Sequence, residues 1–145
     1  MTDAVVRALQ TALAAEHSAC YGYGVVGAYL AAGSPALSAA GTDWLAHQRA
    51  RDQLIVMISD RGGQPAPSAV AYTLPFPVTS AAAAAQLAAT MEDGVAAAYL
   101  AVVALTERDL RVFGADQVRV AALRAESWRG STQAFPGLPP TSLRR

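Results

Sequence analysis

Glu16 is the residue whose type and position most clearly suggest chemistry. The segment from residue 9 to residue 30 repeats apolar side chains at the spacing of one helix face. The inward positions of that face are Leu9, Leu13, Glu16, Cys20, Tyr23 and Leu30. A carboxylate therefore stands where a leucine is expected, and burying it without a partner costs more than a fold can spare. We expect Glu16 to meet a cation, a metal ion or a proton inside the protein.

A second helical segment carries a histidine and an arginine on its apolar face. His47 and Arg51 are four residues apart, so they lie one above the other on the same side of the helix. Glu16 precedes the expected turn at Gly33 by seventeen residues, and Arg51 follows Ser34 by seventeen. At about 1.5 Å of rise per residue, Glu16 is level with Arg51 and about one turn from His47. The spacing predicts a Glu16–His47–Arg51 cluster.

Two more glutamates and a second arginine complete the predicted buried polar cluster. Glu92 flanks the apolar face of a third segment, and Glu126 and Arg129 follow in a fourth, three positions apart. A chain turn at Gly114 leaves the two glutamates at different depths, whereas a turn nearer Asp109 makes them level. The sequence leaves the position of that turn open.

Three readings of this cluster follow from its residue types. As a structural feature, it is an ion-pair and hydrogen-bond cluster that fixes the register of the helices and needs no cofactor. As a metal site, it holds a single Fe, Mn or Zn ion, because imidazole and carboxylate ligands suit these metals. The ligands would then be Glu16, His47, Glu92 and Glu126. As a metal-free pocket, it performs catalysis or binds a small ligand.

Breaks in the helical pattern divide residues 1–145, a single domain, into four helices. We expect helices at about 2–32, 35–61, 80–113 and 115–131. The short turn at Gly33 makes the first two an antiparallel hairpin, and Ser34 with Pro35 begins the second helix.

The long connection between the two pairs of helices decides the predicted architecture. Residues 62–79 contain four prolines, so we expect a crossover rather than a helix, and residues 132–145 form an extended tail. Two helical hairpins joined by one long crossover are typical of ferritin-like bundles. The predicted fold is therefore all-α, a ferritin-like antiparallel four-helix bundle.

The composition narrows the possible partners. Eleven arginines balance eleven acidic residues and lysine is absent, which excludes the excess of positive charge that nucleic-acid binding needs. No stretch offers the roughly 20 predominantly apolar residues of a membrane span, and no basic-then-apolar leader opens the sequence. The single cysteine, Cys20, suits a reducing compartment, so we expect a cytoplasmic protein. Alanine-rich helix faces and the apolar stretch 94–106 further predict a homodimer.

Five stretches carry a resemblance to a known family. They are AAEHSACYGYGVVGAYL, AHQRARDQL, AYTLPFPV, the segment around Glu92 and the terminal FPGLP. In these stretches, which together span nearly the whole chain, the sequence resembles the actinobacterial ferritin-like domain of unknown function DUF4439. The resemblance implies a four-helix bundle without an established biochemical activity.

The resemblance also invites comparison with the metal site of the wider ferritin-like superfamily. Its members bind two metal ions with one Glu on each of two helices and Glu-x-x-His on each of the other two. Glu16 and Glu92 match the single glutamates. The second helix instead reads Trp44-x-x-His47, so one carboxylate is missing there.

The fourth helix departs from the superfamily pattern as well. It reads Glu126-x-x-Arg129, in which a fixed cation replaces the imidazole, and Arg51 adds a second positive charge. We therefore expect a bundle with an incomplete di-metal site and a structural, interaction or binding role. The alternative is a metal-binding oxidoreductase with a reduced ligand set.

Overall fold

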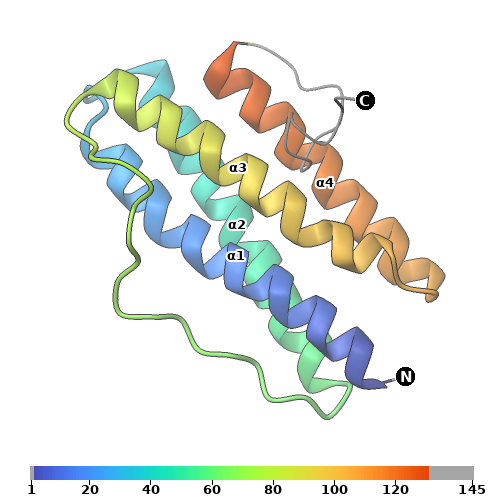
Figure 1. Ribbon diagram of the computed structural model, residues 1–145. Coiled ribbons are helices and arrows are strands. Elements are labelled where there is room, and N and C mark those ends of the chain that lie inside the picture. The colour runs from blue at the N-terminus through green and yellow to red at the C-terminus, as the bar shows by residue number, and fades with distance from the viewer. Residues whose placement is uncertain (1, 131–145) are drawn as a thin grey trace, which may run out of the picture.

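The computed structural model describes residues 2–130 and contains four helices. They are α1 (Thr2–Ala28), α2 (Pro35–Ser59), α3 (Ala81–Val103) and α4 (Arg108–Arg129). Within residues 2–130 there is no strand, and no helix combines the length and apolarity of a membrane span. Figure 1 shows the helices lying lengthwise beside one another, with α1 packed against α2 and α3, and α3 against α4. The expected tail, 132–145, lies outside the described residues.

Serine side chains cap two of the helices where the sequence places helix starts. The Ser34 hydroxyl accepts a hydrogen bond from the Leu37 N–H at 3.1 Å, and Pro35 occupies the first turn of α2. Gly33 has a φ of +73°, which lets the chain reverse between α1 and α2. Ser80 caps α3 in the same way through the Ala83 N–H. The first two helices are shorter than expected, since α1 ends at Ala28 and α2 at Ser59, whereas α4 is longer because it begins at Arg108.

The segment between α2 and α3 runs along the outside of α1 as an extended crossover (Figure 1). Gln10 holds it twice, donating to the Gln64 carbonyl and accepting from the Ala66 N–H. The His17 Nε2–H donates to the Ala66 carbonyl at 3.0 Å. Further along, the Tyr72 ring packs on Tyr21 with centroids 5.5 Å apart. Side chains of α1 therefore form hydrogen bonds with backbone groups of a segment that makes no helical hydrogen bonds of its own.

Buried apolar side chains form two clusters, one toward each end of the bundle. One contains Leu13, Leu54 and Val95, and the other contains Tyr23, Ala40 and Leu87. On α2 and α3, the sequence between the two clusters includes a buried polar residue, His47 and Glu92 respectively. On α1, the buried Glu16 lies between Leu13 and Ala19 of the first cluster.

The turn between α3 and α4 lies close to the second position considered from the sequence, nearer Asp109, and not at Gly114. α3 ends at Val103 and α4 begins at Arg108, so the turn comprises residues 104–107. Gly114 lies inside α4 and is buried. A Cβ atom there would lie 3.0 Å from the Val103 backbone nitrogen and 3.1 Å from the Val102 Cβ. This glycine permits a close approach of α4 to the end of α3 and does not break a helix.

We expect Gly114→Val to lower the free energy of unfolding by roughly 1–3 kcal/mol, because the added side chain must push α4 away from α3. Gly94→Ala is the matched control. Gly94 also lies within a helix, but a Cβ there meets nothing within 4 Å. That variant should gain up to about 1 kcal/mol from helix propensity. Denaturant unfolding of both variants measures the difference, and equal effects would contradict the close approach at Gly114.

Candidate functional site

His47 lies at the centre of the buried polar residues, between two carboxylates from different helices. Its Nδ1 is 2.6 Å from Glu16 Oε2 on α1, and its Nε2 is 2.9 Å from Glu92 Oε1 on α3. All three side chains are at most 1% exposed. With a carboxylate acceptor at each ring nitrogen, both nitrogens carry a proton, and the ring is an imidazolium cation.

Two tyrosines complete the arrangement from opposite sides. The Tyr99 hydroxyl donates to Glu16 Oε1 at 2.7 Å, and the Tyr23 hydroxyl donates to Glu92 Oε1 at 2.6 Å. The Tyr23 ring also stacks on His47 with centroids 5.3 Å apart. Burial, and then the charge of the neighbouring glutamate, raise the pKa of each tyrosine, so both remain neutral donors. We call Glu16, Tyr23, His47, Glu92 and Tyr99 the polar core.

The balance of burial and hydrogen bonding fixes the charge of His47. Burial alone would lower its pKa, because desolvation disfavours the cation. The hydrogen bonds to Glu16 and Glu92, together with the negative charges of these residues, outweigh that effect and raise the pKa from 6.5 to about 9. His47 therefore supplies the positive charge inside the polar core at neutral pH.

One oxygen of the polar core has no partner. Glu92 Oε1 accepts from both His47 and Tyr23, whereas Glu92 Oε2 is buried without a hydrogen bond from any described residue. An unsatisfied buried acceptor costs about 1–3 kcal/mol. A proton or a cation can be added at this oxygen without breaking an existing hydrogen bond.

Asp43 extends the hydrogen bonds from the polar core to α4. Its Oδ2 accepts from Trp128 Nε1 at 2.9 Å and lies 3.3 Å from the Tyr23 hydroxyl oxygen, whose proton points to Glu92. Its Oδ1 pairs with Arg124 Nε at 3.2 Å. A chain of polar contacts thus joins all four helices. Asp43 was not among the residues predicted for the site. For Tyr23, its position on an apolar helix face was the signal that its hydroxyl needs a buried hydrogen-bond partner.

The remaining expected site residues lie outside the polar core. Arg51 pairs with Asp52 at 2.8 Å and is 30% exposed, because its long side chain reaches solvent instead of Glu16. Arg129 pairs with Asp93 at the surface. Glu126 is half-buried and makes no side-chain hydrogen bond or ion pair with described residues. The Arg129–Asp93 pair nevertheless places this end of α4 beside the part of α3 that carries Glu92.

A two-metal centre of the ferritin type does not fit these residues. Trp44 stands in the position of a ligand, but its side chain offers only an N–H donor and is 40% exposed. Glu126 makes no hydrogen bond with any residue of the polar core. Both nitrogens of His47 are engaged by carboxylates, whereas a metal ligand needs a free nitrogen lone pair. In the part of the chain that the structure describes, no group of three or more His, Cys, Asp or Glu residues is arranged to hold a metal ion.

Comparison with known proteins places the chain in a family. Residues 8–140 match the domain of unknown function DUF4439. The chain belongs to this family. A crystal structure of a conserved hypothetical protein from Mycobacterium tuberculosis, Rv2844, is similar to this DUF4439 protein at 39% identity with a TM-score of 0.84. The similarity covers 88% of this chain and 96% of that one. No curated protein matches the chain.

The raised pKa of His47 predicts how the stability of this DUF4439 protein depends on pH. The folded-state value of about 9 lies above the unfolded value of 6.5. The stabilisation is therefore complete below pH 6.5 and is lost as the pH rises through about 9. At about 1.4 kcal/mol per pKa unit, the loss is roughly 3 kcal/mol.

Denaturant unfolding across this pH range measures the predicted loss. His47→Gln serves as the control, because it cannot titrate and should show a much flatter profile. The measurements stay at or below about pH 9, because above it the unfolded Cys20 thiol ionises while burial keeps the folded one, with its pKa raised from 9.0 to about 11, protonated. A wild-type stability that is constant across the range would contradict an imidazolium at position 47.

Proposed function

We propose that this protein is a ferritin-like helical bundle in which an imidazolium between two carboxylates takes the place of a di-metal centre. Its role is then structural or in binding and interaction with other molecules, and it is not a metal-dependent oxidoreductase. The observation that carries the proposal is the engagement of both His47 nitrogens by Glu16 and Glu92. Metal ions in such a bundle hold carboxylates from several helices together, and His47 does the same through charge-assisted hydrogen bonds.

Electrostatics supports a role of the polar core in fixing how the helices pack. Glu16, His47 and Glu92 come from three helices, and a shift of any one helix by a turn would separate them. Separation would leave a buried charge unpaired, at a cost of about 3–5 kcal/mol. The alanine-rich helix faces accept many similar packings, so a penalty of this size selects one of them. A unique, rigid arrangement is what a binding scaffold requires.

One observation favours the rival metal reading. Glu92 Oε2 is buried, lacks a partner among the described residues, and belongs to the same carboxyl group that contacts His47. A single Fe, Mn or Zn ion at this oxygen would satisfy it, with Glu16 and His47 turned to become ligands. That rearrangement would break two hydrogen bonds of His47, and so we favour the metal-independent proposal.

The homodimer expected from the sequence stays a prediction. Part of its basis was the apolar stretch 94–106, which forms the second half of α3 and most of the turn after it, and there Val95, Tyr99 and Val102 are buried within the chain. Val56 on α2 and Val112 on α4 are 57% and 60% exposed and leave apolar surface available for a partner.

Metal content separates the two readings directly. Protein expressed in medium supplemented with iron, manganese and zinc should contain no stoichiometric metal by mass spectrometry. Glu16→Ala and Glu126→Ala are the paired variants, one inside and one outside the polar core. About one ion per chain that is lost in Glu16→Ala would establish the rival metal site, and its loss in Glu126→Ala as well would place Glu126 among the ligands.

The structural reading also predicts that Glu16→Ala and Glu126→Ala change the free energy of unfolding by different amounts. Glu16→Ala should lower the free energy of unfolding of the metal-free protein by about 3–5 kcal/mol, because it strands the His47 cation and the Tyr99 hydroxyl. Glu126→Ala should change it by less than about 1 kcal/mol. Denaturant unfolding in the presence of a chelator measures both values. Similar losses in the two variants would mean that the polar core does not stabilise the fold as proposed.

A further inference from the structure

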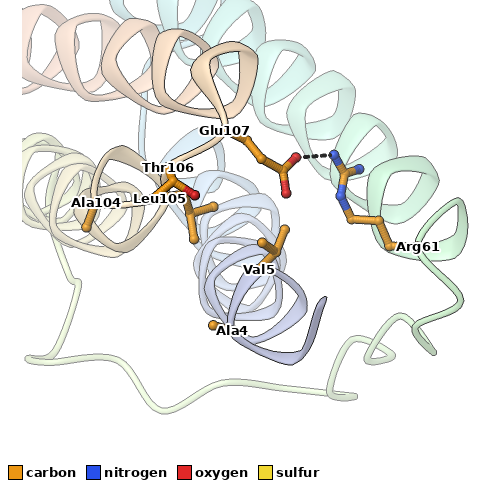
Figure 2. A pocket seen from close by; sticks show the side chains of 7 residues that line it. All are labelled: Ala4, Val5, Arg61, Ala104, Leu105, Thr106 and Glu107. Atoms are coloured by element: carbon orange, nitrogen blue, oxygen red, sulfur yellow. Dashed lines mark hydrogen bonds and ion pairs between the residues drawn. The ribbon is translucent and has the colours of Figure 1, made fainter. Parts of the chain in front are cut away.

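A pocket lies at the end of the bundle where α1 begins and α2 ends, away from the polar core. Its volume is about 440 Å³. Figure 2 shows residues from three separate parts of the chain around it: the first turns of α1, the turn that follows α2 and the turn between α3 and α4. They are Ala4, Val5, Arg61, Ala104, Leu105, Thr106 and Glu107. Most of this lining is apolar, and the charged side chains of Arg61 and Glu107 lie on one side.

Arg61 is held in place by two hydrogen bonds. Its Nη1 donates to the Met57 carbonyl at 3.0 Å, and its Nη2 donates to Glu107 Oε2 at 3.1 Å. A guanidinium group has five N–H donors, so donors remain for a ligand. The side chain is 28% exposed, which leaves the group accessible from the pocket.

Glu107 is oriented toward the pocket rather than toward its own helix. It occupies the N-cap position of α4, but its side chain makes no capping hydrogen bond. Its carboxylate instead reaches across to Arg61, as the dashed line in Figure 2 shows. Its Oε1 accepts no hydrogen bond from the described residues, and the side chain is 48% exposed. A cation and an anion with free hydrogen-bonding capacity therefore stand side by side above an apolar pocket.

We propose that this pocket binds a small zwitterion with an apolar side chain, of the class of leucine and similar α-amino acids. The ligand carboxylate bonds to the guanidinium of Arg61, and its ammonium bonds to the carboxylate of Glu107. The aliphatic side chain lies against Val5 and Leu105. Charge complementarity selects this class. A simple carboxylic acid would leave Glu107 facing a second anion, and a simple amine would leave Arg61 facing a second cation.

This binding site goes beyond the function proposed for the polar core and does not depend on it. The two groups of residues share no side chain, and none of the variants designed for the pocket alters Glu16, His47 or Glu92. A negative result for the pocket therefore does not affect the proposal for the polar core, and the reverse also holds.

The test uses NMR titration of the whole protein with three matched compounds. L-Leucine carries both charges, 4-methylpentanoate carries only the carboxylate, and 3-methylbutylamine carries only the ammonium. Wild-type protein should bind leucine at least about tenfold more tightly than either analogue, since loss of one good charge contact costs at least about 1.4 kcal/mol. The shifted amide signals should belong to residues near 4–5, 61 and 104–107. Equal affinity for leucine and either analogue would overturn the proposal, as would no saturable binding of leucine.

Two charge variants give opposite changes in selectivity. Glu107→Gln should weaken leucine binding about tenfold or more while improving binding of 4-methylpentanoate, because Arg61 loses its internal partner. Arg61→Gln should abolish binding of both compounds and improve binding of the amine. Unchanged leucine affinity in either folded variant would refute the charge-pair site.

Two further variants control for indirect effects. Ala4→Leu adds volume to the pocket wall and should reduce leucine affinity without changing any charge. Arg119→Gln removes one side of the remote Arg119–Asp116 surface pair, which should leave leucine affinity unchanged. Circular dichroism checks that each variant is folded. If Arg61→Gln unfolds, the change in preference between leucine and 4-methylpentanoate in Glu107→Gln tests the proposed site by itself. A loss of affinity in Arg119→Gln equal to that in Glu107→Gln would show a non-specific charge effect and overturn the site.

Discussion

A buried cation between two buried anions is the interaction on which the packing of this protein depends. His47 could not remain charged in an apolar interior by itself, and neither could Glu16 nor Glu92. Their hydrogen bonds, at 2.6 and 2.9 Å, offset the desolvation of all three groups. Tyr99 and Tyr23 add a neutral donor to each carboxylate. The cluster is therefore stable only when helices α1, α2 and α3 stand at the matching depth.

The apolar contacts around the polar core do little to fix the positions of the helices along their axes. Many of the contact positions on α3 are alanines, such as Ala84, Ala88 and Ala96, which allow helices to come close without fixing their register. Directional contacts perform that task instead. The polar core fixes the middle of the bundle, Asp43 ties α4 to it, and the Arg61–Glu107 pair joins α2 to the start of α4 at the far end. In this DUF4439 protein, the apolar helix faces thus allow several helix positions, and a few polar contacts select one of them.

The contrast between Arg51 and His47 explains why no arginine enters the polar core. Arg51 lies one turn from His47, close enough in sequence to compete for Glu16, but its guanidinium pairs with Asp52 near solvent. A long flexible side chain can keep its charge hydrated, whereas the short imidazole side chain of His47 cannot reach the surface. The residue with the shorter reach therefore becomes the internal cation.

The sequence by itself determined the number of helices, the crossover and the helix faces that carry Glu16, His47 and Glu92. These features follow from local signals: apolar periodicity, the Ser34–Pro35 start of α2, and a proline-rich stretch that cannot be helical. Only the tertiary structure decided which polar residues meet. The turn at residues 104–107 has no glycine or proline to mark it, and Gly114 serves a close approach of two helices instead of a turn. The partner of Arg129, which is Asp93, and the lack of a hydrogen bond between Glu126 and the polar core depend on how α4 packs on α3, which local periodicity does not show.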